Sequence, residues 1–483
     1  MKRIPFQEAA ARYPKGDPEG AGKLLASRLE KSGRKLVVLD DDPTGIQTVH
    51  DVSVYTDWSQ ESIDAGFQEE NRTFFILTNS RSFSAQRTEE VHREIALRVA
   101  EAARKSCKDY LLVSRGDSTL RGHYPLETET LRRTLEQQGE LSFDGEIILP
   151  FFREGGRYTL ENIHYVLEND ILTPAGETEF AKDKTFGYRS SDLREWVEEK
   201  TKGTYRAGEV TEIPLSLLRR QDVAAVTNRL EQVTGFGKVI VNALDECDVM
   251  VFCAALYDAL DRGKRFLYRT AAAFVKAAGG ITSRPLLSRR ELIPEGVSRG
   301  GLIIAASHTK KTTAQLGALK TVPGVEFVTF DQHLALWPEK LEAEAQRTAE
   351  EADRLIRAGR TAAVCTRRER LDLNTGNPED ELRIATAISD AVTSIAARLT
   401  ARPSFILAKG GITSSDVGVK ALKVRRARAA GQIQPGVPVW FTGEESRFPG
   451  MPYIIFPGNV GTEDTLKKAV SLLMCIDTAG GEK

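Results

Sequence analysis

Short apolar runs alternate with longer stretches of helical periodicity along this chain, and that alternation limits its fold more than any other feature. Leu36–Leu39, Thr73–Thr78 and Tyr110–Val113 have the aliphatic and β-branched make-up of strands that are covered on both faces. Between two of them, Ser84–Lys105 has helical spacing, with Ser84 at the position of an N-cap. Strands that alternate with helices in this way predict βαβ units around a mostly parallel sheet.

The same alternation continues to the end of the sequence and restarts after a break. Further strands are expected at Val52–Tyr55, Glu146–Leu149, Lys238–Val241, Phe266–Tyr268, Leu302–Ala305, Glu326–Thr329, Thr361–Cys365, Ser404–Leu407 and Tyr453–Phe456. A chain of 483 residues is too long for one core, and Gly279–Gly301 concentrates Gly, Pro, Ser and Arg. We therefore predict two α/β domains with mostly parallel sheets and the active site in the cleft between them. The domains are residues 1–285 and 301–483, with a linker at 286–300 and a charged insertion at about 173–214.

Composition excludes several classes of function. The net charge of -1 gives no electrostatic footprint for nucleic acid, and no apolar run approaches the length of a membrane span. Five scattered cysteines without a C-x-x-C pair suggest neither a disulfide framework nor a zinc site. We expect a cytoplasmic protein that acts on small molecules, without nucleic acid or membrane partners, and a homodimer is possible.

Polar residues follow three successive apolar runs of the first domain. LVVL is followed by Asp40, Asp41 and Asp42, FFILT by Asn79-Ser80-Arg81, and YLLV by the segment Ser114–Arg121. Because ligands bind outside the carboxyl ends of strands in open α/β sheets, these residues should share one rim. The alternative for each segment is a solvated surface loop.

The residue types on this rim suit a small carboxylate-bearing metabolite. The guanidinium groups of Arg81, Arg115 and Arg121 match a carboxylate with two parallel hydrogen bonds, although any one of them could form a surface salt bridge instead. Asp117 and Ser118, or one of the opening acids, could accept hydrogen bonds from, or donate them to, hydroxyl groups of the same ligand. Ser114 completes the candidate substrate contacts.

The second domain has a rim of glycine and hydroxyl residues. Three strand-to-helix loops are candidates, and their nucleotide-binding residues would be Ser307 in the first, Gly410, Gly411, Thr413 and Ser414 in the second, and Gly458, Asn459 and Gly461 in the third. Backbone N–H groups in such loops can hold phosphate. Neither a P-loop nor a dinucleotide-binding G-x-G-x-x-G after the first strand is present.

Five motifs together resemble the four-carbon acid sugar kinases, over nearly the whole chain. The segments similar to the family's motifs are Asp41-Asp42-Pro43-Thr44-Gly45, Thr78-Asn79-Ser80-Arg81, Asp117-Ser118-Thr119-Leu120-Arg121-Gly122, Gly410-Gly411-Ile412-Thr413-Ser414 and Gly458-Asn459-Val460-Gly461. Asp40, His123 and Ile412 depart from the commoner pattern, which has an acid at position 412, and with the 173–214 segment they suggest a subgroup with its own acid.

The resemblance implies a kinase that phosphorylates a hydroxyl of a small sugar acid such as threonate or erythronate, with ATP and Mg²⁺. The first domain would bind the acid and the second the nucleotide. Asp42 is the first choice for the catalytic carboxylate and Asp41 the second, and no metal ligands are assigned. An isomerase or dehydratase of hydroxy acids, or a sensor that binds a sugar acid and nucleotide without turnover, remain the alternatives.

Overall fold

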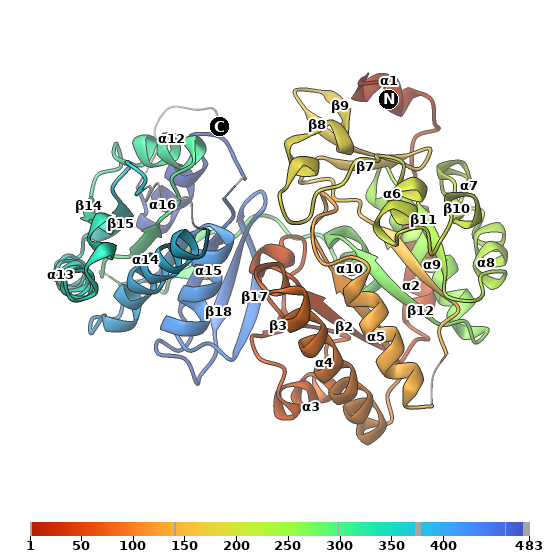
Figure 1. Cartoon of the computed structure of the whole chain (residues 1–483), viewed down its shortest axis with the longest axis horizontal. Coiled ribbons are helices and arrows are strands. Elements are labelled where there is room, and N and C mark those ends of the chain that lie inside the picture. Colours follow the sequence, from red (N-terminus) through yellow and green to blue (C-terminus); the bar gives the residue numbers. More distant parts are fainter. Residues whose placement is uncertain (1, 140–141, 298, 372–377, 459, 477–483) are drawn as a thin grey trace. The chain divides into compact units, whose positions relative to one another are not determined.

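The chain folds into two compact α/β units, Met1–Ser283 and Arg284–Lys483. The computed structural model describes residues 2–139, 142–297, 299–371, 378–458 and 460–476, and Figure 1 shows the elements of both units. Each unit contains a large sheet with helices, as the alternating pattern predicts.

The N-terminal unit is built on strands that all pair in parallel. Their order across the sheet is β10-β11-β6-β12-β5-β2-β4-β3. In chain order these strands are β2 Lys35–Asp40, β3 Val52–Tyr55, β4 Thr73–Leu77, β5 Tyr110–Arg115, β6 Gly145–Leu149, β10 Thr211–Ile213, β11 Gly237–Val241 and β12 Phe266–Thr270.

The N-terminal unit has helices that cover its large sheet and a first helix that contacts the short strand Ile4–Pro5. They are α1 Phe6–Ala11, α2 Pro18–Leu29, α3 Gln60–Gln68, α4 Ala85–Ser106, α5 Leu126–Gln137, α6 Leu193–Lys200, α7 Leu215–Arg219, α8 Val223–Glu231, α9 Glu246–Asp261 and α10 Ala272–Ala278. All of β2 is buried, since Val37 and Leu39 pack with Val91 and Ile95 of α4 while α10 lies near the strand as well. Burial on both faces explains the continuous apolar run. Ser84 caps α4 as predicted, accepting a hydrogen bond from the backbone N–H of Arg87 at 3.2 Å.

The strand order changes direction at β2. The chain places β3 and β4 on one side of β2 and then crosses to β5 on the other side. A ligand-binding crevice in an open α/β sheet lies at such a switch point, outside the carboxyl ends of the strands. The register pairs Asp40 with both Leu77 and Arg115, so the three polar segments that follow these residues do leave the sheet at one edge.

The charged insertion expected at about 173–214 contributes buried residues to the N-terminal unit. The segment begins within a small antiparallel sheet of order β1-β9-β8-β7, formed by Ile4–Pro5, Ile171–Pro174, Ile163–Glu168 and Arg157–Leu160. Leu193, Trp196 and Val197 of α6 are fully buried, and Trp196 stacks on Tyr124 with 4.4 Å between ring centroids. The sequence analysis missed the short apolar face of α6, because most residues around it in the sequence are charged or polar.

The C-terminal unit has a mixed sheet of order β17-β18-β19-β16-β13-β15-β14. Its strands are β13 Leu302–Ala305, β14 Val325–Phe330, β15 Thr361–Thr366, β16 Ile406–Lys409, β17 Arg426–Gln434, β18 Val437–Thr442 and β19 Pro452–Phe456. Its helices are α11 Arg289–Leu292, α12 Lys310–Leu319, α13 Pro338–Arg357, α14 Pro378–Arg398, α15 Gly411–Asp416 and α16 Thr465–Met474. The pairings from β19 to β14 are parallel, whereas β17 and β18 form an antiparallel hairpin that the sequence analysis did not predict.

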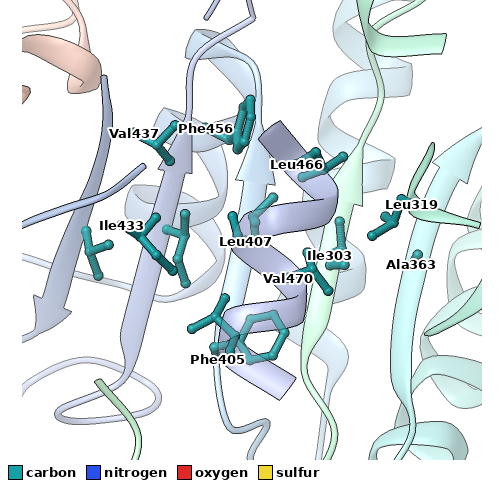
Figure 2. Packing of buried hydrophobic residues seen from close by; sticks show 14 of the residues in the cluster. Ile303, Leu319, Ala363, Phe405, Leu407, Ile433, Val437, Phe456, Leu466 and Val470 are labelled. Carbon is teal, nitrogen blue, oxygen red and sulfur yellow. The ribbon is translucent and has the colours of Figure 1, made fainter. Parts of the chain in front are cut away.

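One face of this sheet packs against α16. Figure 2 shows Leu466 and Val470 of that helix directed at Ile303 and Leu407, which lie on the neighbouring strands β13 and β16. These side chains are all fully buried. The packing fixes the two strands whose carboxyl ends carry the first two candidate loops.

The segment expected to be a linker, residues 286–300, packs into the C-terminal unit instead. Leu287, Leu292 and Ile293 are buried in the core of that unit, and the backbone N–H of Leu287 donates to the Gln432 carbonyl at 2.7 Å. Its Gly, Pro and Arg content reflects turns around α11 rather than a free connection.

Candidate functional site

The acidic turn begins with a buried pair of opposite charges. Asp40 ends β2, Arg115 ends β5, and Arg115 Nη1 donates to Asp40 Oδ1 at 3.3 Å. Burial raises the pKa of Asp40 to about 7, although the nearby Arg115 opposes the shift. Around neutral pH a substantial fraction of Asp40 is therefore protonated.

Asp41 is held by a two-pronged contact with Arg81. Arg81 Nε donates to Asp41 Oδ2 at 3.1 Å, and Arg81 Nη2 donates to Asp41 Oδ1 at 2.6 Å. Asn79, in the left-handed conformation with φ of 60°, turns the chain just before Arg81. Burial raises the pKa of Asp41, while Arg81 opposes the shift. The fork of Arg81, which we expected to bind a substrate carboxylate, thus binds a carboxylate of the chain itself.

Asp42 is the most accessible of the three acids. Its side chain is 18% exposed, against 3% for Asp41 and 2% for Asp40. Asp42 Oδ1 accepts from the backbone N–H of Thr44 at 2.9 Å, and Asp42 Oδ2 lies 3.5 Å from Arg81 Nη1. Gly45 lies against Asp40, because a Cβ at Gly45 would be 1.9 Å from Asp40 Oδ2. The turn formed by Thr44 and Gly45 therefore covers Asp40, whereas Asp42 remains partly exposed to solvent.

Asp117 and Arg121 form a second ion pair, on the loop after β5. Arg121 Nε donates to Asp117 Oδ2 at 2.7 Å, and the Thr119 hydroxyl also donates to Asp117. Burial alone would raise the pKa of Asp117, but Arg81 and Arg121 hold it well below its ordinary value. Arg121 Nη1 also lies 3.8 Å from Asp183 Oδ2, so the 173–214 segment contributes a charge to this edge.

Ser114 and Ser118, two of the predicted substrate contacts, are buried. The buried hydroxyl of Ser114 donates to Glu127 Oε2 at 3.0 Å, and Ser80 donates to the other oxygen of Glu127 at 2.7 Å. Ser118 is also buried, and its carbonyl accepts a hydrogen bond from His164 Nε2 at 2.8 Å. The geometry gives Ser114 and Ser118 structural partners at this edge.

Sequence reasoning missed two arginines of this edge. Arg269 of β12 is buried, and its Nη2 donates to the Arg121 carbonyl at 3.0 Å. Arg157 of β7 lies over the ring of Phe180, with 5.3 Å from Cζ to the ring centroid. The only sequence signal for Arg269 was a charged residue inside an apolar strand, Phe266–Thr270. Arg157 lies in a strand too short for periodicity to reveal.

In the C-terminal unit, the three glycine and hydroxyl loops also leave one edge of the sheet. The register pairs Ala305 with Lys409 and Lys409 with Phe456, the residues that end β13, β16 and β19. Gly410 has φ of 112°, which a residue with a side chain rarely adopts. The chain therefore turns sharply from β16 into α15.

Three of the four predicted residues of the second loop, Gly410, Gly411 and Thr413, are partly exposed, and the fourth is buried. Ser414 is buried, and its hydroxyl donates to the Ala408 carbonyl at 2.8 Å. Gly411 and Thr413 are partly exposed, and a Cβ at Gly410 would meet only Thr413 Oγ1, at 3.7 Å. An incoming ligand can therefore approach the backbone at Gly410, while Ser414 holds the turn together.

A buried lysine lies between the second and third loops. Lys409 is fully buried, and its Nζ has the Pro457 carbonyl at 3.5 Å and the Phe456 ring centroid at 4.5 Å. Burial lowers the pKa of Lys409 to about 8, with a further contribution from Lys311. No carboxylate of the described residues pairs with Lys409, so its charge is available to an anionic ligand.

A second unpaired cation lies beside the first loop. Arg368 Nη2 donates to the Ser307 carbonyl at 2.7 Å and to Thr313 Oγ1 at 2.9 Å. Its Nε and Nη1 atoms are buried and have no hydrogen-bond partner among the described residues. The Ser307 hydroxyl itself contacts Thr309 Oγ1 at 3.3 Å. Arg368, which the sequence analysis did not single out, thus has two donors free for an anion next to Ser307.

The third loop is described except for one predicted residue. Asn459 lies outside the described residues. A Cβ at Gly458 would meet no atom within 4 Å, whereas one at Gly461 would lie 2.5 Å from Thr465 Oγ1. Gly461 is thus needed for close packing on α16, and Gly458 leaves open space at the edge.

Neither a metal cluster nor a membrane span is found in the part of the chain that the structure describes. No three His, Cys, Asp or Glu side chains there are placed to share a metal ion. None of the described helices combines the length and hydropathy needed to cross a membrane.

Two family models match this chain, one within each of its two structural units. Residues 36–278 match the family described as "Sugar-binding N-terminal domain", and residues 302–466 match "Nucleotide-binding C-terminal domain". The chain belongs to the four-carbon acid sugar kinase family. The N-terminal unit is the sugar-binding domain of this family and the C-terminal unit its nucleotide-binding domain.

Solved structures share the fold of this acid sugar kinase family member. A Salmonella typhimurium LT2 protein described as "putative tRNA synthase" is 18% identical, with a TM-score of 0.66 over 90% of this chain and 98% of that protein. A Haemophilus influenzae protein of the DUF1537 family is also 18% identical, with a TM-score of 0.57 over 90% of this chain and 100% of its own. No protein of curated function matches the chain in sequence.

The departure of this family member at position 412 is visible in the structure. Ile412 is 67% exposed at the start of α15, where the commoner family pattern has an acid. The described residues of this unit therefore do not fit a magnesium ion held by a set of protein carboxylates. They do fit a magnesium ion that is carried by the phosphates of a nucleotide, because such an ion needs few protein ligands.

Proposed function

We propose that this protein is a kinase that transfers the γ-phosphoryl group of ATP to a hydroxyl of a small sugar acid, a four-carbon acid such as threonate or erythronate. The observation that carries the proposal is the contrast between the two strand edges. The sugar-binding unit offers an accessible carboxylate, Asp42, beside arginines, and the nucleotide-binding unit offers Lys409 and Arg368 without carboxylate partners.

Asp42 is the proposed catalytic carboxylate, ahead of Asp41. Both oxygens of Asp41 accept hydrogen bonds from Arg81, whereas Asp42 Oδ2 has only the longer 3.5 Å contact and reaches solvent. Asp42 orients the attacking hydroxyl and accepts its proton as the oxygen bonds to the γ-phosphorus and ADP leaves. Arg81 holds both acids in place and limits their repulsion.

The nucleotide's phosphates are proposed to lie at the edge formed by the loops after β13, β16 and β19. Lys409, Arg368 and the backbone near Gly410 would neutralise and position them. A magnesium ion that binds with the nucleotide would supply further charge neutralisation, and we assign no protein side chain to it.

The test is release of ADP from ATP across a panel of four- to six-carbon sugar acids. Asp42→Asn should lower kcat about 100-fold or more while the Kd for ATP, measured by calorimetry, stays within about twofold. Asp51→Asn, an exposed acid on the same segment, serves as the matched control and should behave as wild type. Equal losses of turnover and ATP affinity in Asp42→Asn would contradict the role of Asp42. ADP release that no sugar acid stimulates would contradict the kinase.

A further inference from the structure

The arginines that the sequence analysis assigned to a substrate carboxylate all have acidic partners within the chain. Arg81 contacts Asp41 at 2.6 Å, Arg115 contacts Asp40 at 3.3 Å, and Arg121 contacts Asp117 at 2.7 Å. A guanidinium that is already bonded to a carboxylate has less capacity to bind another. The cation that holds a substrate carboxylate is therefore better sought elsewhere on this edge.

Arg157 and Arg269 are the arginines at this edge without an acidic partner among the described residues, but Arg269 Nη2 already donates to the Arg121 carbonyl at 3.0 Å. Arg157 is the candidate that remains. It begins β7, and no described residue forms a hydrogen bond or ion pair with its guanidinium group. Its Nε is buried, and burial lowers the pKa of Arg157 while Asp117 acts in the opposite direction. A partly buried guanidinium without acceptors is unfavourable, yet arginine remains protonated in proteins. The guanidinium group of Arg157 can therefore donate hydrogen bonds to an anionic ligand.

The surroundings of Arg157 place it beside the loop that follows β5. Arg121 and Arg157 both lie over the ring of Phe180, with Cζ-to-centroid distances of 5.2 Å and 5.3 Å. Gly155 packs against the ring of Phe152, because a Cβ there would lie 2.5 Å from that ring and 3.4 Å from Arg157 Nη1. Tyr188 also lies near Arg157, and its hydroxyl donates to the Thr119 carbonyl at 2.8 Å.

We infer that Arg157 binds the carboxylate of the substrate and so selects sugar acids over uncharged polyols. The inference rests on the proposed function, which supplies the sugar acid. Asp117, Arg121 and Glu168 are the other charged groups that act on Arg157, and their two negative charges disfavour an anion with a higher charge than a carboxylate. Phe180 supplies an apolar surface against which a short carbon chain can lie.

The experiment compares wild type with Arg157→Met, Arg157→Lys and the control Arg153→Met. Arg153 lies on the same segment, is largely exposed and pairs with Asp245 at 3.5 Å. Kinetics are measured with threonate and erythronate, with the matching uncharged polyols threitol and erythritol, and with ATP varied. Binding of each acid without nucleotide is measured by calorimetry, so that substrate recognition is read independently of phosphoryl transfer.

Arg157→Met should raise KM and Kd for the acid about 10- to 100-fold, as expected for loss of a charge-assisted hydrogen bond. The KM for ATP should change less than about twofold, and the preference for acid over polyol should fall by the same factor as acid affinity. Arg157→Lys should fall between wild type and Met, because it keeps the charge and loses the planar fork. The thermal midpoint of Arg157→Met should fall little, since the guanidinium loses its contact with the Phe180 ring but no hydrogen bond or ion pair with a described residue.

Two results would overturn the inference. One is a KM for the acid, or an acid-to-polyol preference, that changes no more in Arg157→Met than in Arg153→Met. The other is wild-type protein that binds neither acid in the calorimeter. If the wild type binds an acid but releases no ADP, the kinase proposal fails alone, and the calorimetric comparison of the variants still decides the role of Arg157.

Discussion

Replacing Asp40 with Asn tests whether the Asp40 carboxyl group stays protonated in the folded protein at pH values where it is ionised in the unfolded chain. Burial raises the pKa of Asp40 from 3.8 to about 7. Between these two pH values the folded protein binds more protons than the unfolded chain, so its stability must fall as pH rises. The stabilisation from the protonated carboxyl group is fully present below about pH 4 and is lost as pH rises through about 7.

The magnitude follows from the two pKa values. Between about pH 5 and about pH 8, this one group should lower the free energy of unfolding by about 2–3 kcal/mol. Asn keeps an oxygen that can accept the 3.3 Å hydrogen bond of Arg115 but cannot ionise. The stability of Asp40→Asn relative to wild type should therefore rise by about that amount over the same pH interval.

Hydrogen exchange of peptides from β2 and β5, measured by mass spectrometry, gives the stability of the N-terminal unit alone. The measured quantity is the difference in this stability between Asp40→Asn and wild type. Comparing two proteins at one pH cancels the pH dependence of intrinsic exchange. Val38→Ala is the control, because it lowers the stability of the same strand without removing a titratable group. The free energy of unfolding of Asp40→Asn minus that of wild type should be larger at about pH 8 than at about pH 5. If this difference is the same at the two pH values, or is smaller at the higher one, Asp40 does not have the raised pKa described above.

Three other substitutions test single contacts. Gly45→Ala should destabilise the N-terminal unit by about 1–3 kcal/mol in urea denaturation, since its Cβ would lie 1.9 Å from Asp40 Oδ2; unchanged stability would show that the turn can move away. Ser114→Ala should cost about 1–2 kcal/mol because the 3.0 Å hydrogen bond to buried Glu127 is lost, with an unchanged KM for the acid; a raised KM would return Ser114 to the substrate site. Arg368→Met should raise the KM for ATP about tenfold or more and leave the KM for the acid unchanged, and an equal effect on both would contradict its role.

The sheet edges could be predicted from the sequence because their physical basis is local. A strand covered on both faces is a continuous apolar run, and the polar residues that follow it must leave the sheet at its carboxyl end. The runs ending at Asp40, Leu77 and Arg115 follow this logic, and the structure pairs these residues in register. The hairpin of β17 and β18 escaped prediction because Arg426–Gln434 mixes charged, small and apolar residues without a clear period of two.

The pairing of charges could not be predicted in the same way. Which arginine meets which acid depends on side-chain directions at a crowded edge, and sequence spacing does not contain that information. Arg81 lies 40 positions from Asp41 in sequence and still supplies both of its hydrogen bonds. Arg157 could not be identified from the sequence for a related reason. It reaches the edge from a separate small sheet, and it stands out only because no described residue forms a hydrogen bond with its guanidinium group.

The balance of charge at each edge supports the division of ligands between the two units. At the N-terminal edge, acids such as Asp41, Asp42 and Asp117 lie among the arginines, so positive and negative charges are mixed, which suits a monovalent carboxylate better than a ligand with several negative charges. At the C-terminal edge, the Lys409 and Arg368 side chains have no acidic partner among the described residues, which suits a ligand that brings several negative charges. A polyphosphate at the first edge would face Asp42 and Asp117, whereas a sugar acid at the second would leave buried cations unpaired. Charge matching thus assigns the acid to the first unit and the nucleotide to the second, independently of the family to which the chain belongs.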